Sequence, residues 1–471
     1  MVAGARLAIE AGWEVRGSDN PLYPPTSHMV KALGVPVASN YDAANLDWGP
    51  DLMVIGNALS RGNPEVEAAL ERRLCYLSLP EWLKTFVLRP RRPIVICGTH
   101  GKTTTTALAA HVLDRTGHNP GFLIGGEPLD FPFSARLGPK GAPFVIEGDE
   151  YDTAFFDKRA KFFHYIPEIA VVTSVEFDHG DLYQNLAEIE RAFQLMLRQI
   201  PRSGRIVLCA DDPGAAALRD HAYSQIVTYG FADHADWRIH QTGVSPYAGM
   251  TQATVHRGGA HYVDLEVPLA GRHNMRNVLA AVVVADLCGA TPDAIGNALR
   301  AFRGIRRRME VFLEAEGITF VDDFAHHPTA IRETIAAARE KWFSSSTHTN
   351  AHTAPIPSRK LWVLFEPRSN TTVTNVFQRE LRQALADADE VWVGPLYRPE
   401  RIPQERRLSR ERLVAELAGD GVPAHAANEV RGIVEYLRHH GREGDVVLIM
   451  SNGDFGGIYE RLRNAFGLTC K

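Results

Sequence analysis

Short apolar runs alternate with longer segments of helical periodicity along most of the chain. Apolar runs bounded by turn residues are typical of strands buried on both faces. The runs interpreted as strands include Leu52–Asn57, Ile94–Ile96, Pro143–Ile146, Ile169–Val175, Leu361–Phe365, Glu390–Val393 and Val446–Met450. Helical periodicity follows most of them, as in Ala107–Leu113 and Val278–Leu287. This alternation predicts the α/β class with mostly parallel, doubly wound sheets.

The chain is too long for a single hydrophobic core, because it has 471 residues. We expect three domains, 1–88, 89–303 and 304–471, each built on a mostly parallel sheet. The Pro- and Arg-rich segment Arg89–Pro93 is the predicted linker between the first two.

The first domain begins in an unusual way. Residues 1–12 have the pattern of a helix that ends at Gly12. A nucleotide-binding βαβ unit normally starts with a strand and a Gly-rich turn before its first helix. We therefore expect an abbreviated first domain, either because the chain starts inside its first βα unit or because the domain is shorter by nature.

Composition narrows the class of protein. The chain is 45% hydrophobic and 23% charged, with a net charge of −5, so it shows no polycationic surface for nucleic acid. Its five cysteines are scattered without a Cys-x-x-Cys pair, which favours a reducing compartment and argues against a zinc site. No apolar run has the length of a membrane span. We expect a cytoplasmic protein without membrane insertion; the sequence leaves its oligomeric state open.

The most informative segment is Ile94–Thr106, in which a strand-like run leads into Gly98-Thr99-His100-Gly101-Lys102-Thr103-Thr104. It resembles a phosphate-binding loop, shortened because Ile96 stands where the strict motif has glycine. Lys102 is expected to lie exposed and unpaired at the mouth of the loop, where it neutralises the β- and γ-phosphates. Thr103 is expected to ligate Mg²⁺. The alternative, an ordinary Gly-rich turn, does not explain a lysine followed by four threonines.

Two acidic clusters follow predicted strands. Glu147–Asp152 follows one strand, and Glu176-Phe177-Asp178-His179 follows another. Carboxylates at the carboxyl ends of parallel strands face the ligand crevice, and Mg²⁺ needs only one or two of them. The alternative for each cluster is a solvated loop.

Three further segments carry candidate chemistry. Asn274 and Asn277 suit either an adenine edge or a helix cap, with equal weight on spacing alone. Arg306–Arg308 is a solvated basic run or a phosphoryl clamp. Asp322–Pro328 places two aspartates and two histidines at a strand-to-helix turn, although the spacing matches no familiar zinc pattern.

Taken in order, these motifs resemble the ATP-dependent Mur ligases of peptidoglycan synthesis, and in particular their UDP-N-acetylmuramate-binding branch. The motifs are GTHGKTTTT, EGDEYD, EFDH, GRHNMRN, GIRRRMEV and DDFAHHPTAI. Other segments are more similar to the tripeptide-adding members than to the L-alanine-adding ones: Gly56–Pro64, Gly121–Gly126, Tyr151–Lys158, Glu366–Thr371 and Ser451–Gly457.

The resemblance implies three α/β domains with a central P-loop ATPase-like domain. It implies ATP- and Mg²⁺-dependent ligation of L-alanyl-γ-D-glutamyl-meso-diaminopimelate to UDP-N-acetylmuramate, in peptidoglycan recycling. Ligation of L-alanine is the alternative within the family. A binding-only pseudoenzyme and a nucleotide-switch ATPase are more remote alternatives.

The resemblance also implies roles for individual residues. Lys102, Arg308 and His179 would be catalytic, and Thr103, Glu147 and His179 would bind metal. Asp19 would contact the uridine of the sugar nucleotide, and Arg368, Ser451 and Asn452 would bind the peptide. ATP would contact Gly98, Thr99, His100, Gly101, Lys102, Thr103, Thr104, Asn274, Asp323 and His327. Among these, Asn274 would read the adenine and Asp323 would contact the ribose.

Overall fold

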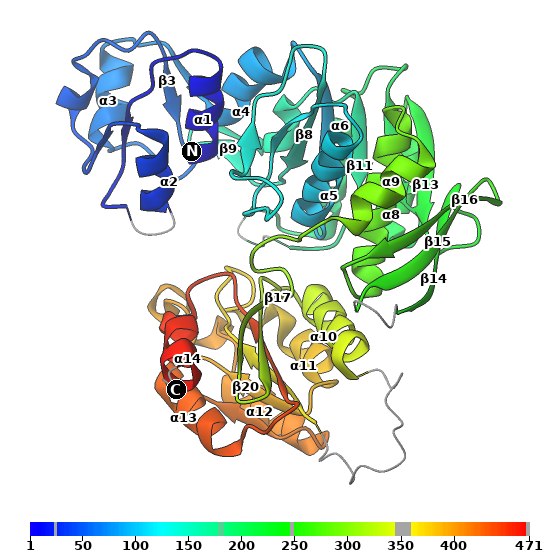
Figure 1. The fold of residues 1–471 in the computed structure, drawn as a ribbon. Helices are drawn as coiled ribbons and strands as arrows, with labels where there is room; N and C mark the ends of the chain where they lie inside the picture. The colour runs from blue at the N-terminus through cyan, green and yellow to red at the C-terminus, as the bar shows by residue number, and fades with distance from the viewer. Residues whose placement is uncertain (23–25, 179, 181, 245–248, 344–358, 468–471) are drawn as a thin grey trace.

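The chain forms three α/β domains, seen as separate bodies in Figure 1. The computed structural model describes residues 1–22, 26–178, 180, 182–244, 249–343 and 359–467. Within these residues no helix is long and apolar enough to cross a membrane. The predicted class, with mostly parallel sheets, is confirmed.

The first domain holds two small parallel strand pairs, β1–β2 and β3–β4, in place of one continuous sheet. In the described residues β1 and β3 each pair on one side only. Residues of both strands and of α1 line a cavity of about 750 Å³. The elements are α1 Val2–Glu10, β1 Gly17–Ser18, α2 Thr26–Leu33, β2 Val37–Ala38, β3 Met53–Ile55, α3 Pro64–Glu71, β4 Tyr76–Ser78 and α4 Leu79–Trp82.

The second domain is built on a sheet with the order β16-β15-β14-β13-β12-β11-β5-β8-β6-β7 in the described residues. Its centre, from β6 to β13, is parallel. The strands are β5 Arg92–Cys97, β6 Gly121–Leu123, β7 Ala135–Arg136, β8 Pro143–Gly148, β11 Ile169–Val172, β12 Arg205–Cys209, β13 Gln225–Gly230, β14 Trp237–Val244, β15 Thr251–Arg257 and β16 Ala260–Val267. A small hairpin, β9 Asp152–Ala154 and β10 Asp157–Ala160, stands apart.

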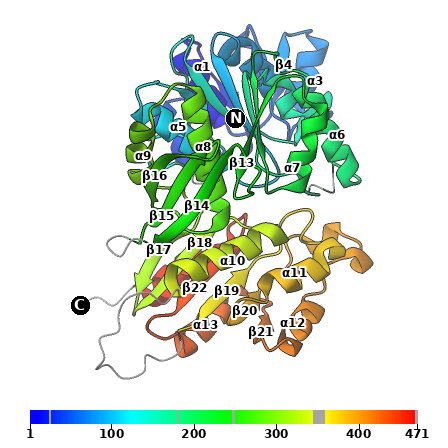
Figure 2. The same ribbon diagram turned by 90° about the vertical axis from the view of Figure 1, so that its right-hand side faces the viewer.

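Helices cover both faces of this sheet. Figure 2 shows α5, α8 and α9 on one side of the strands and α6 and α7 on the other. Their bounds are α5 Lys102–Arg115, α6 Leu186–Leu197, α7 Pro213–Ala217, α8 Arg272–Leu287 and α9 Pro292–Arg300. This coverage explains why β5, β8 and β11 are apolar runs: both of their faces are buried.

The third domain has a sheet with the order β17-β18-β22-β19-β20-β21 among the described residues. The strands are β17 Glu310–Ala315, β18 Ile318–Asp323, β19 Leu361–Phe365, β20 Glu390–Val393, β21 Ala424–Ala426 and β22 Val446–Met450. The helices are α10 Pro328–Phe343, α11 Gln378–Leu385, α12 Arg410–Gly419, α13 Val430–His440 and α14 Ile458–Phe466.

Strand β19 shows how an apolar run serves two cores. Leu361, Val363 and Phe365 pack with α10, α11 and α12, which lie over one face of the sheet in Figure 2. Trp362 and Leu364 point to the opposite face and pack with α13 and α14. Alternate side chains of a strand point to opposite faces, so a strand covered on both sides must be apolar throughout.

The junctions between the domains differ in part from the predicted linker. Arg92 and Pro93 already belong to β5, while a π-helical segment, Leu83–Leu88, leads toward it. The second junction carries positive φ angles at Gly304 (98°), Arg307 (60°) and Met309 (51°). The exact domain boundaries 88/89 and 303/304 stay a prediction.

Candidate active site

The phosphate loop connects β5 to α5 in the strand–turn–helix arrangement that the sequence indicates. Gly98 has φ 128° and Gly101 has φ 80°, in the region that favours glycine. A Cβ atom on Gly98 would lie 2.1 Å from Thr173 Oγ1, and one on Gly101 would lie 2.4 Å from Asn277 Oδ1. Both glycines are therefore required by conformation and by the close approach of neighbouring strands and helices.

Lys102, the first residue of α5, is not exposed and unpaired as expected; that expectation was wrong. Its Nζ donates hydrogen bonds to Glu150 Oε2 at 2.9 Å and to the Gly98 carbonyl at 2.7 Å, and its side chain is 13% exposed. Burial lowers the pKa of Lys102, but Glu150 and Asp149 raise it further, so the net shift is upward. The cause is topological: β8 pairs in parallel with β5, so the acidic segment after β8 lies beside the loop.

Glu147 lies at the end of β8 and not in the loop that the sequence indicates. It accepts hydrogen bonds from Thr103 Oγ1, at 3.0 Å, and from the Gly125 amide. Burial and the charge of Asp149 raise its pKa to about 7, against the lowering effects of the Gly125 hydrogen bond and Lys102. A hydroxyl beside a buried carboxyl that lacks a full counter-charge suits Mg²⁺, which prefers oxygen ligands and would neutralise the acid.

Replacing Glu147 by glutamine is expected to raise the Mg²⁺ concentration needed for half-maximal activity several-fold, because one anionic ligand is lost at constant size. If the Mg²⁺ titration does not change, Glu147 is not a ligand and Asp149 or Glu150 is the next candidate.

The same variant tests the raised pKa. The pKa of Glu147 is 4.5 in the reference state and about 7 in the fold, so the protonated carboxyl stabilises the folded state. This contribution is full below pH 4.5 and is lost as the pH rises through 7. In Mg²⁺-free buffer, Glu147→Gln is therefore expected to melt at a higher temperature than the wild type at about pH 8. The expected gain is on the order of 3 kcal/mol. Near pH 4 the two should melt alike; equal melting at both pH values would contradict the raised pKa.

A cavity of about 260 Å³ opens between the second and third domains beside the phosphate loop. It is lined by Thr103, Asn274, Arg308 and Asp323, which the sequence assigns to ATP and Mg²⁺ and which come from widely separated segments. Arg308 has no ion-pair partner in the described part of the chain, and its guanidinium lies 5.1 Å from the Phe324 ring centroid. A guanidinium free of carboxylates at a cavity wall is available to a phosphoryl group.

The two asparagines lie in the first turns of α8, and neither caps this helix, because Gly271 occupies the N-cap position. Asn274 Nδ2 donates to the Ala270 carbonyl at 2.8 Å. Asn277 Oδ1 accepts from Thr105 Oγ1 at 3.2 Å and so fastens the first turn of α5, just after the phosphate loop, to α8. Sequence reasoning missed this positioning role, because the contact joins segments 172 residues apart. Adenine recognition by Asn274 stays a prediction.

Two charged residues, the buried Asp323 and the half-buried Arg307, secure the junction before β17. Asp323 accepts hydrogen bonds from the amides of Met309, at 2.9 Å, and Ala325, at 2.8 Å. Arg307 donates to Asp322 and to the carbonyls of Ser451 and Gly453, so this arginine serves the third domain. The backbone already uses both oxygens of Asp323, and its predicted ribose contact remains a prediction.

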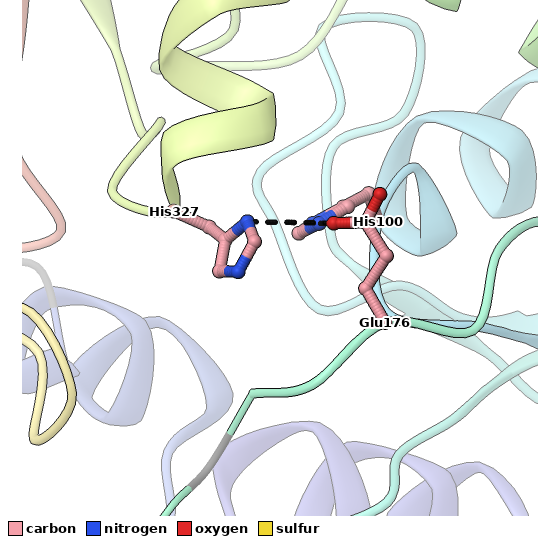
Figure 3. Close-up of side chains that lie close together, drawn as sticks. All are labelled: His100, Glu176 and His327. Atoms are coloured by element: carbon pink, nitrogen blue, oxygen red, sulfur yellow. Dashed lines mark hydrogen bonds and ion pairs between the residues drawn. The ribbon is translucent and has the colours of Figure 1, made fainter. Parts of the chain in front are cut away.

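Three side chains meet where the second and third domains touch, as Figure 3 shows. Glu176 Oε2 lies 3.1 Å from His100 Nε2 and 3.7 Å from His327 Nδ1, and it accepts from Thr329 Oγ1 at 2.8 Å. Burial alone raises the pKa of Glu176, but the hydrogen bond and charge of His100 outweigh it and lower the pKa to about 2. Burial lowers the pKa of His327 to about 4. His179, predicted to bind metal, lies outside the described residues.

The predicted peptide-binding residues gather at the carboxyl ends of β19 and β22. The Arg368 guanidinium stacks 3.9 Å from the Tyr397 ring centroid and lies 3.4 Å from Glu366 Oε1. Asn452 Oδ1 is buried without a hydrogen-bond partner in the described residues. Ser451 is fully buried and donates to Glu366, so its hydroxyl supports Glu366 and does not face the solvent.

Asp19, the predicted uridine contact, follows β1 and lines the first-domain cavity. It accepts a hydrogen bond from Tyr41 Oη at 2.8 Å. That hydrogen bond, with burial as the larger cause, raises the pKa of Tyr41 to about 12. Thus the predicted sugar-nucleotide site and the predicted ATP site lie in different domains.

Comparison with known protein families agrees with this geometry. The model "Mur ligase family, catalytic domain" matches residues 1–91, "Mur ligase middle domain" matches 96–285, and "Mur ligase, glutamate ligase domain" matches 307–453. The chain belongs to the Mur ligase family. The predicted ligase class and three-domain architecture are confirmed for this Mur ligase.

Several relatives extend over nearly the whole chain. The UDP-N-acetylmuramate–L-alanyl-γ-D-glutamyl-meso-2,6-diaminoheptandioate ligase of Escherichia coli is 39% identical over 97% of this chain and 94% of its own length. The UDP-N-acetylmuramate–L-alanine ligase of a Roseiflexus species is 34% identical over 96% of this chain and 94% of its own. The crystal structure of a murein peptide ligase from Psychrobacter arcticus superposes with a TM-score of 0.70, at 34% identity, over 100% of this chain and 97% of that one.

Proposed function

We propose that this Mur ligase joins L-alanyl-γ-D-glutamyl-meso-diaminopimelate to the lactyl carboxylate of UDP-N-acetylmuramate at the expense of ATP, as part of peptidoglycan recycling. The observation that carries the proposal is the cavity between the second and third domains, which is lined by the phosphate loop and by Arg308. Arg368 and Asn452 lie on the third domain, after the carboxyl ends of β19 and β22. The 39% identity to a ligase named for this tripeptide supports the same acceptor.

The reaction divides into two steps. A lactyl carboxylate oxygen attacks the γ-phosphorus of ATP and ADP leaves, which forms an acyl phosphate. The peptide α-amine then attacks the acyl carbon, loses a proton and expels inorganic phosphate. Little covalent chemistry falls to the protein, so its residues act by orienting reactants and neutralising charge.

The side chains divide this work by their positions. Lys102 would exchange Glu150 for the γ-phosphate, and Arg308 would meet the same group from the domain junction. Thr103 and Glu147 would hold Mg²⁺, which would supply further positive charge to the phosphate groups. Arg368 offers a fork-shaped guanidinium to a carboxylate of the peptide.

The fate of one oxygen atom tests this mechanism. UDP-N-acetylmuramate labelled with ¹⁸O in its lactyl carboxylate is incubated with ATP, Mg²⁺ and tripeptide. We expect one ¹⁸O atom in the inorganic phosphate released per peptide bond, as measured by mass spectrometry. Unlabelled phosphate alongside ligated product would exclude the acyl phosphate, and phosphate release without product would favour a nucleotide-switch ATPase.

The first-domain cavity leads to a prediction about the sugar nucleotide. Within the residues that the structure describes, β1 and β3 each leave an edge unpaired beside the cavity, and a parallel strand could hydrogen-bond to both. A strand followed by a Gly-rich turn, fused ahead of Met1, is expected to tighten binding of UDP-N-acetylmuramate and to leave ATP affinity unchanged, because the two sites lie in different domains. Calorimetry on both versions measures this. Equal affinity for the sugar nucleotide would show that a strand paired with these two edges plays no part in its binding.

A further inference from the structure

The contact between His100, Glu176 and His327 has the composition of a transition-metal site. One ligand atom from each residue lies within 4.8 Å of the other two. Two imidazoles and one carboxylate form a donor set common for Zn²⁺. The side chains are 18%, 32% and 7% exposed respectively, so the group is enclosed and still open to an ion.

The hydrogen bonds of His327 fix its tautomer. Its Nε2 lies 3.3 Å from the Phe177 carbonyl, which only accepts, so Nε2 carries the proton. Its Nδ1 accepts a long hydrogen bond, 3.3 Å, from the Thr329 amide, so Nδ1 is unprotonated. This is the arrangement of metal-binding histidines, in which one ring nitrogen donates to a backbone carbonyl and the other faces the metal.

The unprotonated Nδ1 faces an acceptor. Glu176 Oε2 lies 3.7 Å from it, and the carboxylate is ionised because its pKa is lowered. A cation between the two would meet an anionic oxygen on one side and the Nδ1 lone pair on the other, and it would replace the long hydrogen bond from the Thr329 amide. His100 Nε2 lies 3.1 Å from the same carboxylate oxygen, and the His100 and His327 rings are 4.6 Å apart between centroids, so both imidazoles lie beside Glu176 and complete the ligand set.

We propose that His100 Nε2, Glu176 and His327 Nδ1 bind a Zn²⁺ ion that ties the phosphate loop to the turn before α10. His100 belongs to the phosphate loop, whereas His327 immediately precedes α10 in the third domain, as Figure 3 shows. The ion would thus link two domains beside the predicted ATP site. No spacing motif reveals such a site, because the three ligands lie in three separate segments of the chain.

A second group, Glu81, Asp157 and His164, provides a matched comparison because it also brings three such ligand atoms together. Here an arginine already supplies positive charge to the carboxylate. Asp157 accepts from the guanidinium of Arg159 at 2.9 and 2.7 Å, and Glu81 accepts from Ser78. The Arg159 charge occupies the place of a cation, so we expect no metal at this second group.

Zinc binding is measured directly on the full chain, stripped of metal with a chelator and titrated with Zn²⁺ by calorimetry in millimolar Mg²⁺. The wild type is expected to bind one Zn²⁺ that Glu176→Gln and His327→Gln weaken at least tenfold. The control His164→Gln is expected to keep wild-type affinity. Substitution with Co²⁺ should give the visible absorption of a site with nitrogen and oxygen ligands, reduced in the same two variants.

The proposal is overturned if Glu176→Gln and His327→Gln bind Zn²⁺ as the wild type does, or if His164→Gln loses it equally. Far-ultraviolet circular dichroism of each variant confirms that it is folded before titration. The readout is metal binding and not activity, so a failure of the ligase proposal would leave this result unaffected.

Discussion

Replacing Lys102 by alanine is expected to abolish ligation in the presence of tripeptide, UDP-N-acetylmuramate and saturating ATP. Loss of a charged group that stabilises the transferring phosphoryl group costs about 3 kcal/mol or more of transition-state stabilisation. That corresponds to a fall of at least roughly a hundredfold in kcat. Product formation followed by chromatography measures it, and turnover near the wild-type rate would contradict the role of the loop.

The Lys102–Glu150 contact changes how this variant must be controlled. Glu150 is 3% exposed, and removing its lysine partner leaves a buried carboxylate without that counter-charge. Breaking a buried pair from one side typically destabilises by about 3–5 kcal/mol, so the variant should melt at a lower temperature than the wild type. Lys161→Ala is the matched control, because Lys161 pairs with the neighbouring Asp149 at 3.2 Å but lies outside the phosphate loop. It should retain activity.

Replacing Arg368 by alanine is expected to raise the KM for tripeptide far more than the KM for ATP. Losing a hydrogen bond to a charged group typically costs about 1.5–3 kcal/mol, which is roughly a 10- to 100-fold change. Arg368 is suited to this role because its only ion pair in the described residues is the 3.4 Å contact with Glu366. Steady-state kinetics with each substrate varied in turn separates the two effects.

Arg412→Ala is the control for the loss of a positive charge from the same domain. Arg412 lies on α12 and pairs with Glu416 on the surface. It should leave both KM values unchanged. An equal rise in the KM for ATP and for tripeptide in Arg368→Ala would indicate a general disturbance of the third domain instead of peptide recognition.

The parts of the fold that the sequence predicts well are those in which one local pattern decides the structure. Strands β19, β20 and β22 begin and end at the predicted residues, because strands covered by helices on both faces are continuous apolar runs between polar turns. The antiparallel strands β14 to β16 were not predicted. In β15, Ala253 and Val255 alternate with polar residues, and this pattern in the sequence could have revealed the strand. The two separate strand pairs of the first domain were also missed, because strand pairing depends on distant segments.

In the candidate site, too, local features were predictable from the sequence and contacts between distant segments were not. The phosphate loop is local and was recognisable from its residues. The Lys102–Glu150 pair, the Asn277–Thr105 hydrogen bond and the histidine–glutamate contact each join distant segments, so no spacing reveals them. The arginine run shows where sequence reasoning ends, because the neighbours Arg307 and Arg308 have different surroundings. Arg307 lies inside a hydrogen-bond network, whereas Arg308 lines the cavity and has no ion pair among the described residues.

The choice of acceptor tests the central claim most directly. L-Alanine and L-alanyl-γ-D-glutamyl-meso-diaminopimelate are supplied separately with UDP-N-acetylmuramate and ATP, and the ligated product is quantified to obtain kcat/KM for each. The proposed function predicts that the tripeptide exceeds L-alanine by orders of magnitude, because its carboxylates engage Arg368 and the polar groups around it. Robust ligation of L-alanine alone would contradict this and assign the chain to the L-alanine-adding function.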